Sequence, residues 1–140
     1  MGKYVIKWIR SDGYERFATI EDVRNSAILN IHFLEYDEYL VNGEASQKKQ
    51  QGGIIDGVIS IKLVCFSKRV GEPLSHHQKV KNYPHIEAIV EVTQIVDDYS
   101  VYAISSISDC PILVAFENVI NYKIGEKILV IGSLELVNES

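Results

Sequence analysis

The sequence lacks most of the motifs that identify a catalytic or metal-binding protein. Its 140 residues include only two cysteines and three prolines. The G-x-S-x-G, P-loop, G-x-G-x-x-G and H-E-x-x-H motifs are all missing. Without them, no nucleophile elbow, phosphate cradle or zinc-protease helix can be assigned. We therefore expect a protein that is not an enzyme and that carries no cofactor or metal.

Long apolar runs are also missing, and none approaches the roughly 20 residues that a membrane-spanning helix needs. Charged residues Lys3, Lys7 and Arg10 interrupt the apolar stretches at the N-terminus, which therefore lacks the hydrophobic segment of a secretory signal. We expect a cytoplasmic protein that does not bind membranes. Cys65 and Cys110 fit that compartment, and we expect reduced, partly buried thiols because neither belongs to a C-x-x-C motif.

Charge is distributed unevenly along the chain, whose net charge is −5. Residues 85–140 hold nine acids and two bases, a net charge of −7, whereas residues 48–84 hold seven bases and two acids, a net charge of +5. The first 47 residues contribute −3. Such asymmetry bears on partners and association rather than on fold.

Strict alternation of apolar and polar residues dominates the second half of the chain. Residues 85–96 place Ile86, Ala88, Val90 and Val92 on one face. Residues 127–137 do the same with Ile128, Val130, Gly132, Leu134 and Leu136. A period of two over that length predicts strands with one buried side.

Weaker patterns predict further strands. They fall at residues 4–9, 14–18, 27–33, 54–66, about 99–107 and about 111–117. In the strand at 54–66, alternate residues from Ile55 to Cys65 are expected to share one side, and Gly57 to mark a bulge or bend. Thr19 could cap a short helix at 19–22. Residues 67–84 form a long aperiodic loop, functional or merely mobile, and no internal repeat is visible.

The turn Lys123-Ile124-Gly125-Glu126-Lys127-Ile128 followed by Val130-Ile131-Gly132-Ser133-Leu134 resembles the closing part of an OB-fold barrel. The resemblance covers about residues 54–137 and departs from the family in lacking a clear helix between the third and fourth strands. It implies a single all-β domain over 1–140, with a barrel-like core at 54–137 and an N-terminal β extension at 1–50. A barrel or sandwich of another kind, with five to nine strands, is the alternative.

Two groups of residues could suggest metal or acid–base chemistry. His76, His77 and His85 are metal-ligand candidates, but they lie in or beside a lysine-containing loop, and we favour solvated histidines. The carboxylates at 97–98 and at 35–38 could form acid–base pairs. An Asp-Asp pair between two strands is first of all a turn, so we favour structural roles for both groups.

A basic loop offers one binding hypothesis. Lys68, Arg69, Lys79 and Lys81 could pair with phosphates, with Tyr83 as a stacking platform for bases. This arrangement predicts a single-stranded nucleic-acid-binding domain. The −7 charge of the last 56 residues disfavours a polyanion, so we keep this reading as the alternative.

The acidic half offers the leading hypothesis. Glu87, Ile89 and Glu91 share a strand face, and Glu135 lies on the last predicted strand. Acidic proteins can meet basic targets through such surfaces, using charge to speed encounter and apolar anchors to hold. We expect a non-catalytic protein–protein interaction module, such as a small bacterial accessory or immunity-type protein.

Overall fold

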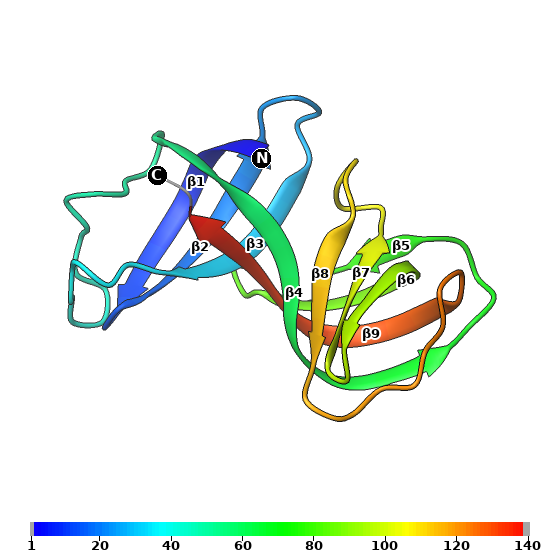
Figure 1. Cartoon of the computed structure of the whole chain (residues 1–140). Coiled ribbons are helices and arrows are strands. Elements are labelled where there is room, and N and C mark those ends of the chain that lie inside the picture. The colour runs from blue at the N-terminus through cyan, green and yellow to red at the C-terminus, as the bar shows by residue number, and fades with distance from the viewer. Residues whose placement is uncertain (1, 139–140) are drawn as a thin grey trace. The chain divides into compact units, whose positions relative to one another are not determined.

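The computed structural model describes residues 2–138, and every regular element among them is a β-strand (Figure 1). The strands are β1 (Gly2–Asp12), β2 (Glu15–Asp22), β3 (Ile28–Leu34), β4 (Ile54–Arg69), β5 (Ser75–His77), β6 (His85–Asp97), β7 (Ser100–Ile104), β8 (Ile112–Phe116) and β9 (Lys127–Asn138). The predicted all-β class is confirmed. Over residues 2–138, no helix is long and apolar enough to cross a membrane.

Alternation in the sequence translates directly into alternating burial. On β6 the side chains of Ile86 and Val90 are fully buried, and on β9 so are those of Ile128 and Val130. Burying one side chain of this size contributes roughly 1.5–3 kcal/mol relative to leaving it in water. The predicted inner faces of these two strands are therefore confirmed.

The nine strands form one sheet that closes in a ring, in the order β1-β2-β3-β9-β4-β8-β7-β6-β5, with additional pairings β1–β4 and β9–β6. Contacts divide the chain into two compact units. The first unit comprises residues 1–58, 80–84 and 135–140, and the second comprises residues 59–79 and 85–134. Strands β4 and β9 therefore contribute residues to both units. A single domain with an extension at 1–50 and a core at 54–137 stays a prediction.

In the first unit, β1, β2 and β3 form an antiparallel meander. β3 then pairs in parallel with β9, where His32 lies opposite Glu135. β1 pairs in antiparallel fashion with the start of β4, from Gly2 opposite Gly57 to Val5 opposite Ile54. Since β9 and β4 are also neighbours, these five strands form a closed circuit.

The second unit repeats that circuit with β4 and β9 exchanged. β6, β7 and β8 form the antiparallel meander. β8 pairs in parallel with the later part of β4, and β6 pairs in antiparallel fashion with the first part of β9. Each meander is therefore completed by the same two long strands in opposite roles. The strand pairing repeats although no sequence repeat is visible.

One glycine in each unit allows β4 and β9 to approach closely. A Cβ on Gly57 of β4 would lie 2.5 Å from the carbonyl oxygen of Val137, and a Cβ on Gly132 of β9 would lie 2.7 Å from that of Lys62. Real Cβ atoms do not come this near a backbone oxygen, so both positions require a residue without one. Gly57 faces Gly2 on β1 and Gly132 faces Ile86 on β6, which makes them equivalent in the two circuits.

The short helix predicted at 19–22 is wrong. These residues are part of β2, because Ile20 and Asp22 are both buried and continue the alternation of the strand. The Asp22 carboxylate accepts a hydrogen bond from the backbone N–H of Arg24 at 2.9 Å and pairs with its guanidinium at 3.2 Å. That pairing keeps Asp22 at the strand end rather than in a helical first turn.

The predicted inner face of β4 is correct only as far as Ile61. Leu63 adopts a left-handed φ of 55° and the pairing with β8 shifts register between Ile61 and Val64. The bulge turns Leu63 and Cys65 outward and Val64 inward. Cys65 and Cys110 are free thiols, as expected, but both are exposed rather than partly buried.

Candidate functional site

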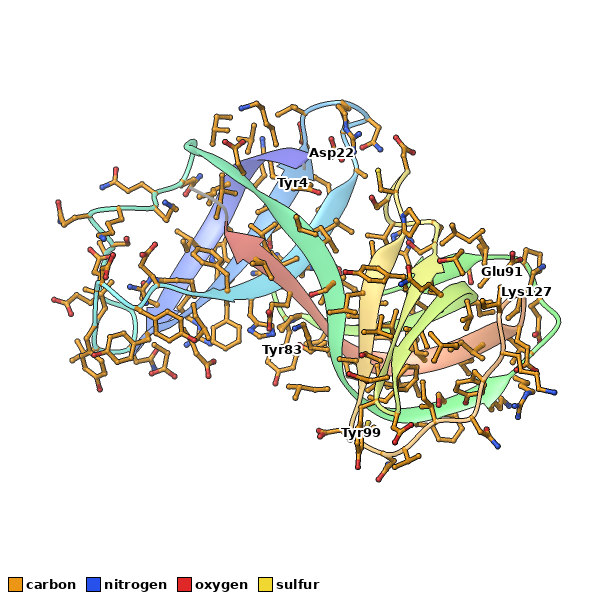
Figure 2. All side chains as sticks on the ribbon, in the orientation of Figure 1. Tyr4, Asp22, Tyr83, Glu91, Tyr99 and Lys127 are labelled. Carbon is orange, nitrogen blue, oxygen red and sulfur yellow. The ribbon has the colours of Figure 1, made fainter. Side chains whose placement is uncertain are left out.

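The outer side of β6 carries three of the four predicted partner-binding residues. Glu87, Ile89 and Glu91 alternate with the buried residues of the strand and are half-buried. Across the ladder to β9 they lie opposite Ile131, Leu129 and Lys127, respectively. Figure 2 labels Glu91 and Lys127, which lie close together on these neighbouring strands. We call the surface formed by Glu87, Ile89, Glu91, Lys127, Leu129 and Ile131 the β6–β9 face.

Aliphatic side chains occupy the middle of this face and charges occupy its ends. Ile89 and Leu129 form the central row, and Ser75 of β5 faces Ile89 from the other side. At one end, Lys79 Nζ lies 3.1 Å from Glu87 Oε1, with the two side chains 57% and 30% exposed. An ion pair this exposed contributes at most about 1 kcal/mol and can exchange for an intermolecular one.

The fourth predicted residue, Glu135, belongs to the first unit, whereas the β6–β9 face belongs to the second. Glu135 Oε2 lies 3.7 Å from His32 Nε2, at the point where β3 pairs with β9. It therefore has a local role in the first unit.

Arg69 of the predicted basic loop is held by the protein itself. Its guanidinium donates to the Glu126 carboxylate at 2.5 Å and to the Asn121 carbonyl oxygen at 3.1 Å, and it lies 5.0 Å from the centroid of the Tyr122 ring. The hydrogen bond to Glu126 raises the pKa of Arg69. The same bond, together with the backbone N–H of Lys123, lowers the pKa of Glu126.

The remaining members of that loop are divided between the two units. Lys68 and Lys79 belong to the second unit, while Lys81 and Tyr83 belong to the first. The Tyr83 ring, labelled in Figure 2, stacks on Phe17 with centroids 6.2 Å apart and an interplanar angle of 13°. Within either unit, therefore, the predicted basic residues and the aromatic platform do not form one cluster.

The histidines are placed by strand structure rather than by a metal site. His76 lies on β5, and its Nδ1 is 2.6 Å from the Ser106 hydroxyl. Burial, and to a lesser extent the neighbouring His77, lowers the pKa of His76. His85 begins β6 opposite Ser133. Among residues 2–138, no group of three His, Cys, Asp or Glu side chains is arranged to hold a metal ion.

The two carboxylate groups have structural partners. Asp97 Oδ1 accepts hydrogen bonds from the backbone N–H of Tyr99 and the hydroxyl of Ser100, both at 2.8 Å, and these bonds lower its pKa. Glu38 accepts from the Ser46 hydroxyl at 2.6 Å and the Gln47 N–H at 2.9 Å, which likewise lowers its pKa. Both carboxylates thus organise the loops in which they lie.

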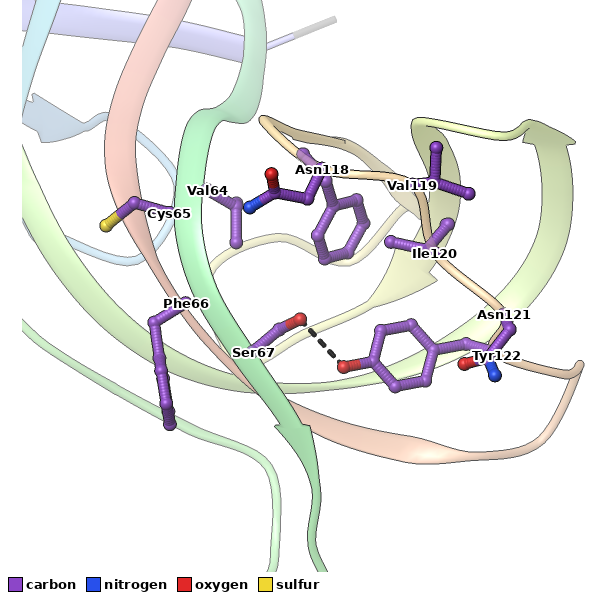
Figure 3. Close-up of a pocket in the computed structure, with 10 residues that line it drawn as sticks. Val64, Cys65, Phe66, Ser67, Asn118, Val119, Ile120, Asn121 and Tyr122 are labelled. Atoms are coloured by element: carbon purple, nitrogen blue, oxygen red, sulfur yellow. Dashed lines mark hydrogen bonds between the residues drawn. The ribbon is translucent and has the colours of Figure 1, made fainter.

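A hollow of about 300 Å³ in the second unit was not predicted (Figure 3). It opens where β4 continues beyond its last pairing with β8, Val64 opposite Phe116. Ser67 and Tyr122 meet across it through a hydrogen bond of 2.7 Å between their hydroxyls, drawn as the dashed line in Figure 3. No sequence signal indicates this hollow, because it depends on where two distant segments separate.

Comparisons with known proteins found no match to this chain. No protein-family model matches the chain. No curated protein and no solved structure matches it either.

Proposed function

We propose that the protein is a non-catalytic binding module that holds a basic protein partner on the β6–β9 face. The observation that carries this proposal is the central row of Ile89 and Leu129 next to Glu87 and Glu91. Apolar anchors bordered by charge are typical of protein interfaces, where aliphatic contacts hold the partner and rim charges guide it.

The proposal rests on this local arrangement and not on the charge blocks of the sequence. Counted by unit, the first has eight bases and eleven acids, net −3, and the second has six bases and eight acids, net −2. The basic and acidic blocks partly neutralise each other, as the Arg69–Glu126 and Lys79–Glu87 pairs show. We therefore expect the local pattern of the β6–β9 face, rather than the net charge of either unit, to select the partner.

The nucleic-acid alternative has less support. Arg69, one of its four bases, is held by Glu126 and Asn121, and Lys81 belongs to a different unit from the other three. Fewer available bases mean fewer phosphates neutralised and weaker binding. Titration with labelled single-stranded DNA and RNA at about 50 mM salt, where electrostatic affinity is high, would reveal such binding.

We also propose a finer assignment of fold and location. The closed five-strand circuit of each unit is of the size of an OB-fold barrel, so the resemblance first noted at 54–137 would apply to both units. We further propose that the protein is cytoplasmic and of bacterial origin.

A photo-crosslinking residue at position 89 tests the face directly. The matched control carries the same crosslinker at Val119, which is 65% exposed and lies in the same unit. The proposal expects one adduct with a distinct basic protein from position 89 in host cells and none from position 119. Identical adducts from both positions, or none from either, would count against the proposal.

Charge reversal supplies the second test. The double variant Glu87→Lys/Glu91→Lys is compared with Glu117→Lys, an exposed acid of the same unit. Because like charges across an interface are repulsive, the double variant should lose the adduct and the Glu117→Lys variant should keep it.

A further inference from the structure

A cluster of three exposed tyrosines lies in the first unit and is not used by the proposed function. Tyr14, Tyr36 and Tyr39 are 45%, 72% and 67% exposed. Tyr14 stands in the middle, with its ring centroid 5.2 Å from that of Tyr39 and 6.3 Å from that of Tyr36. The Tyr39 ring is nearly perpendicular to Tyr14 at 76°, and the Tyr36 ring is tilted by 40°. The Tyr39 and Tyr14 rings thus meet edge to face, and the three rings present differently oriented faces rather than a flat stack.

Backbone hydrogen bonds bring these tyrosines together. Gly13, at the tip of the β1–β2 hairpin with φ of 66°, exchanges two bonds with Leu40, of 2.7 and 3.0 Å. Tyr14 follows Gly13 in the chain and Tyr39 precedes Leu40, so that bridge places the two tyrosines side by side. The N–H of Glu35 donates to the carbonyl oxygen of Tyr14 at 2.9 Å, which brings Tyr36 to the other side of the central ring.

A buried arginine fixes the segments that carry the cluster. Arg16 is fully buried. Its guanidinium donates to the carbonyl oxygens of Gly13 at 2.9 Å, Glu15 at 3.0 Å and Glu38 at 2.5 Å. These three carbonyls flank Tyr14 and Tyr39 in the chain. Because these segments are held in place before any ligand arrives, less ordering is needed on binding.

Electrostatics at this end of the unit favours a cation. Asp12 and Glu15 lie opposite each other across the hairpin, one on each side of Gly13 and Tyr14. Glu35 and Asp37 flank Tyr36 and share a single base, Lys48, at 3.9 and 3.3 Å. In the described part of the chain, the two cation–π contacts are those of Arg10 with Phe17 and Arg69 with Tyr122, so none occupies this cluster.

We propose that Tyr14, Tyr36 and Tyr39 form an open aromatic cage for a quaternary ammonium group. The electron-rich faces of aromatic rings attract cations, and differently oriented rings suit a trimethylammonium head, which presents methyl groups on several sides. The surrounding carboxylates add long-range attraction, while the head needs no directed hydrogen bond. The cage is independent of the β6–β9 face, which belongs to the other unit.

Choline and its uncharged isostere 3,3-dimethylbutan-1-ol separate this proposal from simple apolar binding. Each is titrated into the full chain while the tyrosine ring resonances are followed by NMR. The proposal expects saturable shifts of Tyr14, Tyr36 and Tyr39 with choline and an affinity about fivefold or more weaker for the isostere. Equal affinities, or no saturation by choline at millimolar concentrations, would overturn it.

Ring substitutions locate the binding. Tyr39→Phe keeps the aromatic face and should bind choline as the wild type does, whereas Tyr39→Leu and Tyr36→Leu should each weaken binding severalfold. Tyr99→Leu, at a tyrosine 49% exposed in the second unit, is the control and should have no effect. Unchanged binding by both leucine variants at the cage would refute the assignment. Because Tyr36 is 72% exposed, Tyr36→Leu should fold normally and still test the cage if Tyr39→Leu does not fold.

A second arm identifies where the cation comes from. A short peptide containing trimethyl-lysine is compared with its unmethylated form. Tighter binding of the trimethylated peptide than of choline assigns the cage to a modified protein side chain, and weaker binding assigns it to a small molecule. Equal binding of the two peptide forms contradicts a cage selective for quaternary ammonium.

Discussion

In the first unit, β3 runs parallel to β9 while β1 pairs with β4; in the second, β8 runs parallel to β4 while β6 pairs with β9. The circuits match, yet their surfaces differ. Eight of the thirteen aromatic residues lie in the first unit, including the exposed tyrosine cluster. The second unit instead presents half-buried aliphatics between carboxylates. One arrangement of strands can thus support two kinds of binding surface, because outward residues are free of the packing that fixes the inward ones.

Among the variants that compare the two circuits, the largest effect is expected at the glycines where β4 and β9 approach closely. Gly57→Ala and Gly132→Ala should each destabilise the protein by about 1–3 kcal/mol, because the new methyl group must displace a backbone carbonyl. Gly71→Ala is the control, since no atom lies within 4 Å of its added Cβ. Urea denaturation measures all three. If only one of the two strand glycines is sensitive, the circuits are not equivalent.

A smaller effect is expected where the two circuits differ, at the bulge of β4. Leu63 is 59% exposed and has a left-handed φ, which a leucine adopts at a cost of about 1–2 kcal/mol. Leu63→Asn should therefore stabilise the protein by up to about 1 kcal/mol, whereas Leu63→Val should destabilise it. Thermal unfolding distinguishes the two variants, and a destabilised Leu63→Asn would argue against the bulge.

Lowering the pH should destabilise both units, because each unit contains a hydrogen-bonded glutamate with a lowered pKa. The pKa of Glu38 in the first unit and of Glu126 in the second is lowered by hydrogen bonds. Around and below pH 4.5 the unfolded chain therefore binds more protons than the folded one, and stability falls as pH falls. Glu38→Gln and Glu126→Gln should each reduce the slope of melting temperature against pH between about 5 and 3. A slope unchanged in either variant would contradict the hydrogen bonds assigned to that carboxylate.

The smallest effect concerns a histidine of the second unit. Because burial lowers the pKa of His76, its neutral form is favoured in the folded state. The contribution of neutral His76 to the free energy of unfolding is present above about pH 6.5 and is lost as the pH falls below that value. His76→Gln should remove part of the stability change between about pH 7 and 5.5. His77→Gln removes only the lesser, electrostatic cause of the lowered His76 pKa and should therefore have a smaller effect than His76→Gln.

Eight of the nine strands were predictable because their physics is local, whereas β5 lies in the segment 67–84 that was predicted as an aperiodic loop. Burial of Ile86, Val90, Ile128 and Val130 follows from a period of two, which any reader of the sequence can count. The bulge at Leu63 was not predictable, because a left-handed leucine is tolerated only through pairing with a distant strand. The exposure of Cys65 follows from that same bulge.

The candidate sites were predictable only in part, because their neighbours are distant in the sequence. The outward residues of β6 could be assigned from alternation, but Leu129 and Ile131 join them through a pairing that no local pattern indicates. The basic loop looked available because Glu126, 57 residues from Arg69, could not be placed beside it. The tyrosine cluster depends similarly on the bridge between Gly13 and Leu40.

The central claim is that β4 and β9 complete both circuits, so that neither unit is whole without them. Trp8, the only tryptophan, lies in the first unit, and Ile128 is fully buried in the second. The decisive measurement is denaturation of Ile128→Ala followed by Trp8 fluorescence. We expect Trp8 fluorescence and far-ultraviolet circular dichroism to follow the same unfolding transition. Both should report a free energy of unfolding lower by about 2–5 kcal/mol than that of the wild type. A tryptophan transition that keeps its wild-type midpoint while the dichroism transition moves would contradict the claim.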